Sequence, residues 1–273
     1  MQNDVYVITG GSGGMGKATA KIVGKRGTVL LADLSEERLA QTAKELADAG
    51  ISSVFYQTVD ITSKENVEQL AKQAQSLGTL KGLIHTAGLS PTMADSKTIT
   101  AVNFVGTGLI LDAFLPLATA GTSVVCISSM SGYMAERQGP YTEMLKNPLA
   151  DNAIEAMEQF AQGNAGAAYS LSKLAVQLIV ADQAWTWGQK GARINSLSPG
   201  TINTPMGRQE AEQQKEMATM LALTPLQREG EASEIATAVD FLLSDAASYV
   251  SGIDLRVDGG TVANLQKVQQ QNR

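Results

Sequence analysis

Short apolar segments alternate with longer amphipathic segments along most of the 273 residues, and this alternation constrains the fold more than any other feature. The apolar segments have the length and composition of buried strands and comprise residues 5–9, 28–33, 54–59, 82–86, 123–128, 193–198 and 254–258. Between them, apolar residues recur at helical spacing, as in 35–49, which Ser35 can start and Gly50 can end. The alternation predicts a single-domain α/β fold, in which helices cover both faces of a doubly wound, seven-stranded parallel sheet.

Composition and charge exclude several classes of protein. The chain carries 21 basic and 27 acidic residues, a net charge of −6, whereas a nucleic-acid surface needs clustered lysine and arginine. One cysteine excludes an internal disulfide, and with a single histidine it cannot form a Cys/His zinc site, so no metal is expected. The first residues do not have the pattern of a secretory signal, and no apolar run approaches the roughly 20 residues of a membrane span. We therefore expect a cytoplasmic protein without a nucleic-acid or membrane partner.

A glycine-rich stretch, residues 10–16, joins the first predicted strand to the helix that follows. Glycine is needed where the chain turns tightly and where its backbone approaches a pyrophosphate, which the free N–H groups of the helix then bind. Asp33 ends the second predicted strand, where a carboxylate accepts hydrogen bonds from the ribose hydroxyls of a dinucleotide and repels a 2′-phosphate. A helix N-cap is the alternative role for Asp33. Because Lys17 is the only basic residue near the glycines, the sequence predicts NAD rather than NADP.

Further motifs follow the glycine stretch in a specific order and spacing. They are Thr-Gly-x-x-x-Gly-x-Gly from Thr9, Val59-Asp60-Ile61, Ala87-Gly88, Val102-Asn103-Phe104, Ile127-Ser128-Ser129, Tyr169-x-x-x-Lys173, Pro199-Gly200 with Thr204, and Val257-Asp258-Gly259-Gly260. This series resembles the short-chain dehydrogenase/reductase family over the whole chain. His85-Thr86 departs from the family pattern, which has two asparagines there. The resemblance implies a Rossmann fold with strand order 3-2-1-4-5-6-7 and an NAD-dependent oxidoreductase that acts on CH–OH groups.

The resemblance also implies roles for individual residues. The implied catalytic set is Asn103, Ser129, Tyr169 and Lys173, in which Lys173 also binds the nicotinamide ribose and Asn103 helps to hold a proton-relaying water. The implied cofactor-binding residues are Gly10, Ser12, Gly14, Met15, Gly16, Asp33, Leu34, Asp60, Ile61, Ala87, Gly88, Tyr169, Lys173, Pro199, Gly200, Ile202 and Thr204.

Tyr169 and Lys173 lie four positions apart and therefore share one face of a helix. A lysine ammonium stabilises a phenolate, which lets Tyr169 exchange a proton with a substrate hydroxyl or carbonyl while Ser129 holds the same oxygen. The alternative is an ordinary amphipathic helix with a solvated lysine. Tyr141 also competes for the role, because it follows Ser129 by only 12 residues, but Lys146 is five positions further on and would point away. We therefore predict that Tyr169 is the acid/base.

An insertion, residues 134–168, precedes the predicted catalytic tyrosine. Within it, 150–162 is predicted to be a helix with one stripe formed by Ala153, Met157, Phe160 and Ala161. This helix either packs on its own domain or forms a lid or an oligomer contact. A similar insertion is characteristic of bacterial 3α-hydroxysteroid dehydrogenase/carbonyl reductases, and this resemblance implies a dimer interface and hence a homodimer or homotetramer.

Two further segments depart from the strand–helix alternation. Residues 202–230 carry Met206, Met217 and Met220, and they are predicted either to cover a bulky carbonyl substrate or to form an ordinary surface helix. This segment belongs to a predicted domain that spans 1–262. The polar C-terminal tail spans 263–273, and its residues 265–273 are expected to be frayed. His85, the only histidine, is assigned a packing or cofactor-edge role.

The leading hypothesis is an NAD(H)-dependent enzyme that interconverts a secondary alcohol and a ketone, with a hydroxysteroid or another bulky carbonyl compound as its small-molecule substrate. A 3-oxoacyl-thioester reductase is one alternative, although neither Asp33 nor the acidic net charge favours its NADPH and its acidic carrier. A non-catalytic dinucleotide sensor or structural protein is the other alternative, although such a protein would not need the full predicted catalytic set.

Overall fold

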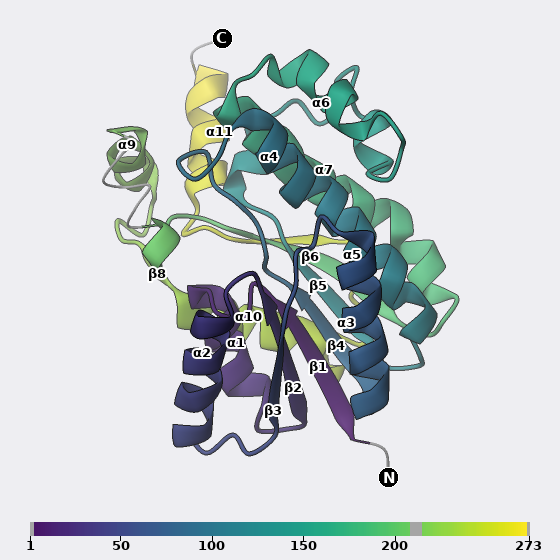
Figure 1. The fold of residues 1–273 in the computed structure, drawn as a ribbon. Coiled ribbons are helices and arrows are strands. Elements are labelled where there is room, and N and C mark those ends of the chain that lie inside the picture. The colour runs from purple at the N-terminus through teal and green to yellow at the C-terminus, as the bar shows by residue number, and fades with distance from the viewer. Residues whose placement is uncertain (1–2, 208–214, 272–273) are drawn as a thin grey trace.

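A parallel sheet of seven strands forms the centre of the molecule (Figure 1). The computed structural model describes residues 3–207 and 215–271. The strand order is β3-β2-β1-β4-β5-β6-β9, which confirms the predicted order. Each strand matches a predicted one, and only β4 differs by more than one residue at either end. The strands are β1 Asp4–Thr9, β2 Thr28–Asp33, β3 Val54–Thr58, β4 Thr79–His85, β5 Ser123–Ile127, β6 Arg193–Pro199 and β9 Asp254–Val257.

Helices cover both faces of this sheet, as predicted, and each face has its own hydrophobic core (Figure 1). One face is covered by α1 Gly14–Val23, α2 Glu36–Asp48 and α10 Ala232–Leu243. The other is covered by α3 Lys64–Leu77, α5 Gly106–Phe114 and α7 Ala165–Gly188. Because all seven strands run parallel, their carboxyl ends meet at one edge of the sheet, where ligands of doubly wound folds bind.

The start of α2 illustrates how local sequence sets an element boundary. The Ser35 hydroxyl accepts a hydrogen bond from the Arg38 backbone N–H at 3.3 Å, which satisfies one of the free donors of the first turn. Leu39 and Leu46 then face the sheet and are fully buried. The helix therefore begins where the sequence predicts it, and it leads directly away from the end of β2.

A long apolar helical segment runs through the core from Ser96 to Leu117. It consists of α4 Ser96–Thr100, a π-helical turn η1 Ala101–Val105, α5 and a 3₁₀ turn η2 Leu115–Leu117. Its 22 residues are long and apolar enough to cross a membrane, so the expectation that no apolar run approaches this length is wrong. In this structure, 56% of its most apolar stretch is buried inside the protein, and a buried core helix passes the same test.

The insertion packs on its own domain. It follows the 3₁₀ turn η3 Met130–Tyr133 and contains η4 Met144–Lys146 and α6 Ala153–Ala161, which contacts α4 and α7. Ala153, Met157 and Ala161 are buried at four-residue spacing, and the Ser96 hydroxyl donates to the Glu158 carboxylate. Phe160 does not belong to this stripe, because its side chain is 38% exposed and stacks edge-on against Tyr141.

The C-terminal region contains smaller elements. β7 Ile202–Asn203 pairs with β8 Gly230–Glu231, α9 Lys215–Leu223 lies between them in sequence, and η5 Asp245–Ala247 precedes β9. Helix α11 Thr261–Gln271 includes most of the tail that was expected to be frayed, so that expectation is wrong through Gln271. Residues 272–273 lie outside the described part of the chain.

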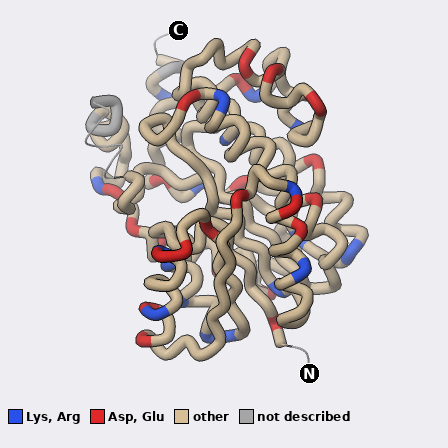
Figure 2. The backbone as a smooth tube through the Cα atoms, in the orientation of Figure 1, with Lys and Arg blue, Asp and Glu red and all other residues tan. Residues whose placement is uncertain are grey.

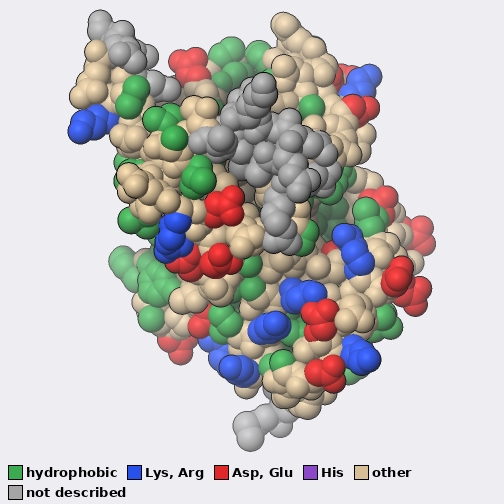
Figure 3. Space-filling model, turned by 90° about the vertical axis from the view of Figure 1, so that its left-hand side faces the viewer, with side chains coloured by type: hydrophobic (Ala, Val, Ile, Leu, Met, Phe, Trp, Pro, Cys, Tyr) green, Lys and Arg blue, Asp and Glu red, His purple; other side chains and the backbone are tan. Residues whose placement is uncertain are grey.

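Charged side chains lie mainly on the outer helices and loops, while the strands of the sheet are largely free of them (Figure 2). On the side of the molecule shown in Figure 3, acidic and basic side chains are interspersed rather than gathered into one patch of a single sign.

Candidate active site

The glycine stretch forms a close-packed turn between β1 and α1. Gly10 has a positive φ of 67°, and a Cβ there would lie 2.7 Å from the Ala87 backbone nitrogen. A Cβ on Gly16 would collide with the Gly10 carbonyl oxygen, and one on Gly14 would lie 2.9 Å from the Thr204 methyl group. Gly13 occupies the N-cap of α1 and has no side chain to cap it, so the helix can offer its first N–H groups to an anion. This cradle fits the pyrophosphate of a dinucleotide.

Asp33 lies at the end of β2 beside this turn and is held by several donors. The Ser12 hydroxyl donates to Oδ2 at 2.5 Å, and the Leu34 N–H donates to Oδ1 at 2.8 Å. The Arg38 guanidinium also lies 3.1 Å from Oδ1, with 63% of its side chain exposed. The sequence-based view that Lys17 is the only nearby base is therefore wrong, since Arg38 is the base next to Asp33. Lys17 instead pairs with a glutamate of α2, Glu45, at 2.7 Å.

Four more of the predicted cofactor-binding residues follow β3 and β4. Asp60 is exposed, and its Oδ1 accepts hydrogen bonds from the N–H and the hydroxyl of Thr62 at 2.8 and 2.6 Å. Ile61 is buried against Gly106 of α5, and Ala87-Gly88 continues directly from β4. These residues therefore reach the same edge of the sheet as the glycine turn, although they come from different strands.

Tyr169 and Lys173 lie one turn apart near the start of α7, as predicted. The Lys173 Nζ is 5.6 Å from the centroid of the Tyr169 ring, and it donates to the backbone oxygen of Ile127 at 3.1 Å. Lys173 is only 7% exposed, so its ammonium acts on the tyrosine with little solvent screening. Tyr141, the competing candidate, instead packs against Phe160 in the insertion.

Asn103 lies in the π-helical turn η1, and such turns frequently mark functional sites. Its side-chain amide makes paired hydrogen bonds with the backbone of Leu89: Nδ2 donates to the carbonyl at 2.9 Å, and Oδ1 accepts from the N–H at 2.8 Å. It therefore clamps the loop that follows β4. A Cβ on the neighbouring Gly88 would lie 3.1 Å from Asn103 Oδ1 and 3.4 Å from Lys173 Nζ, so these two side chains approach the same point of the loop.

Ser129 follows β5 and lies in a small cavity with Tyr169. Its hydroxyl accepts from the Ser131 N–H at 3.1 Å, and this contact orients the side chain. The cavity has a volume of about 130 Å³ and is lined by Met15, Pro91, Ser128, Ser129, Met130, Ser131, Tyr169, Pro199, Gly200, Thr201, Ile202, Thr204, Met206 and Gly207. None of these described lining residues is charged. The cavity therefore suits an uncharged compound placed directly against the predicted acid/base.

The loop after β6 completes the side of this cavity that lies next to the glycine turn. The Thr204 hydroxyl accepts from the Gly207 N–H at 3.0 Å, and its methyl group faces the glycine turn. Thr201 is 9% exposed, and its hydroxyl has no hydrogen-bond partner among the described residues, a feature that the sequence did not reveal. A bound cofactor or substrate offers polar groups that such a hydroxyl lacks. Residues 208–214, and the side chain of Met217, lie outside the described part of the chain.

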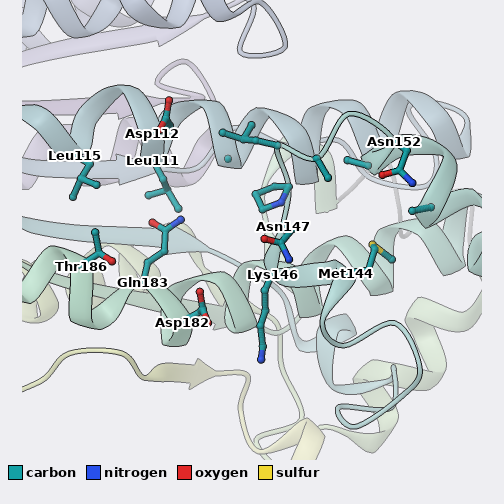
Figure 4. A pocket seen from close by; sticks show the side chains of 16 residues that line it. Leu111, Asp112, Leu115, Met144, Lys146, Asn147, Asn152, Asp182, Gln183 and Thr186 are labelled. Atoms are coloured by element: carbon teal, nitrogen blue, oxygen red, sulfur yellow. The ribbon is translucent and has the colours of Figure 1, made fainter.

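A second and larger groove, of about 800 Å³, lies elsewhere in the molecule. It opens between α5 and η2, which contribute Leu111 and Leu115, α7, which contributes Gln183 and Thr186, and the insertion, which contributes Asn147 (Figure 4). None of its lining residues belongs to the predicted catalytic set or cofactor-binding set. It is therefore separate from the candidate active site. Among the described residues, no group of three histidine, cysteine or acidic side chains could hold a metal ion.

The site and fold agree with known protein families. A family model described as short chain dehydrogenase matches residues 4–142, and one described as enoyl-(acyl carrier protein) reductase matches residues 152–262. The gap between the two matches falls inside the insertion. A short-chain dehydrogenase/reductase of Alternaria brassicicola, bsc3, is 36% identical over 280 residues and covers 98% of both chains. The chain therefore belongs to the short-chain dehydrogenase/reductase family of oxidoreductases.

Other similar proteins include two 3-alpha-hydroxysteroid dehydrogenases and a polyketide ketoreductase. The 3-alpha-hydroxysteroid dehydrogenase/carbonyl reductase of Comamonas testosteroni is 29% identical over 272 residues, covering 97% of this chain and 99% of its own. The 3-alpha-hydroxysteroid dehydrogenase of Pseudomonas sp. B-0831, solved with NADH, is 28% identical with a TM-score of 0.78, and the match covers 96% of this chain and 98% of that one. An actinorhodin polyketide ketoreductase, solved with NADPH, is 26% identical with a TM-score of 0.74, at 95% and 97% coverage. The family thus uses a nicotinamide dinucleotide, and the glycine cradle described above fits one.

Proposed function

We propose that this chain is an NAD(H)-dependent oxidoreductase that interconverts a secondary alcohol and a ketone. One observation carries the proposal. Lys173 Nζ lies 5.6 Å from the centroid of the Tyr169 ring, and Tyr169 and Ser129 line the same uncharged cavity. An amphipathic helix with a solvated lysine does not account for a lysine that is 93% buried between a tyrosine and a strand end. A non-catalytic sensor would not need this arrangement.

Each residue of the predicted catalytic set has a separate role in the proton transfer. A bound nicotinamide dinucleotide supplies or accepts the hydride. Tyr169 gives its phenolic proton to the carbonyl oxygen during reduction and takes it back from the hydroxyl during oxidation. Ser129 donates a hydrogen bond to that same oxygen as its charge develops, and the Lys173 ammonium stabilises the phenolate. Asn103 holds the loop beside Lys173 through its two bonds to Leu89.

The lining of the cavity supports an apolar substrate. Met15, Met130 and Met206 come from three different elements and face one cavity, and methionine adapts its shape to varied apolar groups. The described lining residues offer no cation for a carboxylate or phosphate of a small charged substrate. A hydroxysteroid or a similarly bulky ketone fits this chemistry, and the names of two relatives agree with it.

One specific observation favours a second candidate function, that of an NADPH-dependent 3-oxoacyl-thioester reductase. The exposed Arg38 lies beside Asp33 and could meet a 2′-phosphate by turning away from the carboxylate. Asp33 opposes this function, because a carboxylate at the end of β2 repels a 2′-phosphate and Ser12 and Leu34 hold this one in place. We therefore favour NAD.

Titration of the purified protein with NADH and NADPH, followed by nicotinamide fluorescence, tests the cofactor. We expect NADH to bind at least about tenfold more tightly, and Asp33→Ala to remove that preference, since a charge-assisted hydrogen bond contributes about 1.5–3 kcal/mol. Arg38→Ala is the matched control and should leave NADH binding within about twofold. Tighter NADPH binding that Arg38→Ala abolishes would overturn the NAD assignment.

Oxidation of androsterone and cyclohexanol with NAD⁺ tests the reaction class. We expect turnover of both alcohols, with the larger kcat/KM for the steroid, because its apolar rings offer more surface to the methionines that line the cavity. Turnover of a 3-oxoacyl thioester with NADPH, without oxidation of either alcohol, would instead establish a 3-oxoacyl-thioester reductase.

We also propose a homo-oligomer. Because Met157 is buried in its own subunit, it cannot report on an interface, whereas Phe160 is 38% exposed on the insertion. Phe160→Asp should lower the solution mass measured by light scattering if α6 forms the interface. An unchanged oligomeric mass would place the interface elsewhere.

A further inference from the structure

The only histidine of the chain lies behind the active site rather than in it. His85 ends β4 and is 2% exposed. Both of its ring nitrogens have partners: the Thr9 hydroxyl lies 2.7 Å from Nδ1, and the Thr107 hydroxyl lies 2.9 Å from Nε2. A residue that only fills space needs neither contact, so the geometry points to a polar role.

The direction of these hydrogen bonds follows from a second hydrogen bond that the Thr107 hydroxyl makes. The Thr107 hydroxyl donates its single hydrogen to the Asn103 backbone oxygen at 2.7 Å, so toward the imidazole it can only accept. Nε2 must therefore carry the proton, and Nδ1 accepts from the Thr9 hydroxyl. Burial, with a smaller contribution from the Lys173 charge, lowers the pKa of His85 to about 3 and keeps the ring neutral.

The chain of hydrogen bonds continues to the catalytic helix. The Asn103 amide Nδ2 lies 3.3 Å from the Ser172 hydroxyl, which donates to the Tyr169 backbone oxygen at 2.8 Å. At the other end, Thr9 is the residue immediately before Gly10 of the cofactor turn. One buried path of side chains thus joins the turn after β1, through His85 and Thr107, to the π-helical turn that holds Asn103.

We propose that His85 is a positioning residue that fixes Asn103 through Thr107 and thereby couples the cofactor turn to Tyr169 and Lys173. The Asn103 carbonyl of the π-helical turn accepts the hydrogen of the Thr107 hydroxyl, so this hydroxyl acts directly on the residue that clamps the loop after β4. An Nδ1–H tautomer would leave Nε2 unprotonated, and Nε2 would then compete with the Asn103 carbonyl for the hydrogen of the Thr107 hydroxyl. The neutral Nε2–H tautomer is therefore the form that the site requires.

The tautomer can be measured without any substrate, which separates this inference from the proposed function. Because the chain has one histidine, protein labelled with ¹⁵N-histidine gives a single imidazole pattern in a long-range ¹H–¹⁵N correlation spectrum. We expect a neutral ring protonated at Nε2 that does not titrate between pH 8 and pH 5. Thr107→Val should shift the Nε2 resonance, and Thr107→Ser should not. A ring protonated at Nδ1, or titration near pH 6.5, would overturn the proposal.

A kinetic test of the role of His85 rests on the proposed function and uses two variants of similar side-chain volume. His85→Gln keeps an N–H that can reach Thr107, whereas His85→Leu removes both polar contacts. With androsterone and NAD⁺, we expect His85→Leu to lower kcat about tenfold or more with the KM for androsterone within about twofold. His85→Gln should recover most of the loss, and adding Thr107→Val to His85→Leu should cost little more.

Two results would contradict the kinetic expectation. One is an equal loss of kcat in His85→Gln and His85→Leu, because the matched donor would then be irrelevant. The other is a loss in His85→Leu that appears only in the melting temperature and not in kcat, because His85 would then serve packing alone.

Discussion

The glycine turn and the catalytic junction lie at the same edge of the sheet, but they are built in opposite ways. The turn uses consecutive residues, 10–16, and at Gly10 and Gly16 other backbone atoms lie too close for a Cβ. The junction joins Asn103, Ser129, Tyr169 and Lys173, which come from three elements and are held by side-chain hydrogen bonds. The turn should therefore fail when a side chain is added, and the junction should fail when a side-chain polar group is removed.

The largest effect should come from removing the proton donor at the junction. Tyr169→Phe keeps the ring beside Lys173 but removes the hydroxyl, and we expect kcat to fall about 10³-fold. NADH affinity should stay within about twofold, because the turn is untouched. Steady-state kinetics and fluorescence titration measure both. The control is Tyr141→Phe in the insertion, and if that variant lost as much activity as Tyr169→Phe, the assignment of the acid/base would be wrong.

A smaller effect should come from adding one methyl group to the turn. Gly16→Ala places a Cβ against the Gly10 carbonyl oxygen, which is backbone and cannot swing aside. Overpacking of this kind costs about 1–3 kcal/mol, so we expect NADH affinity to fall about tenfold or more. Gly188→Ala near the end of α7 is the matched control, because nothing lies within 4 Å of its Cβ. Equal NADH affinity in both variants would show that the turn tolerates a side chain.

A third measurement follows the contribution of His85, the buried histidine behind the junction, to the pH dependence of stability. Burial lowers the pKa of His85 from 6.5 to about 3, so between these values the unfolded chain binds a proton that the folded chain excludes. His85 therefore favours the folded state fully above pH 6.5, and this stability is lost as the pH falls toward 3. Between pH 7 and pH 5 we expect a loss of about 2 kcal/mol in the free energy of unfolding relative to His85→Gln.

Urea unfolding of both proteins at the two pH values measures this difference, because the carboxylates common to both cancel. Parallel pH dependences in the two proteins would mean that the imidazole remains accessible to protons when the chain is folded.

Much of the fold was accessible from the sequence because it depends on local pattern. The seven strands follow from short apolar runs, and Ser35 marks the start of α2 by its own hydrogen bond. The contacts that escaped prediction join residues far apart or depend on which way a side chain turns. Arg38 reaches Asp33 across the first turn of α2, and Thr107 joins His85 to Asn103 through a π-helical turn that no sequence period reveals.

Two predictions from the sequence, one for Phe160 and one for the C-terminal tail, are wrong because tertiary contacts decide burial and order there. Phe160 was assigned to the buried stripe of α6, but burial follows the four-residue spacing of Ala153, Met157 and Ala161, which leaves Phe160 at the edge. The tail was expected to fray because it is polar, but α11 begins at Thr261, whose hydroxyl bonds to Thr224. Tertiary contacts at the start of a helix can thus order a sequence that is polar throughout.

The methionines around the substrate cavity have a consequence for the response of this protein to oxidants. Met15 and Met206 are partly exposed at the cavity, and oxidation converts the thioether of methionine into a polar sulfoxide. The single cysteine, Cys126, is protected, since burial raises the pKa of its thiol to about 12 and leaves almost no reactive thiolate. Peroxide should therefore act on the apolar walls of the substrate cavity before it acts on a thiol, and a reductase specific for methionine sulfoxide, rather than a thiol reductant, should reverse the change.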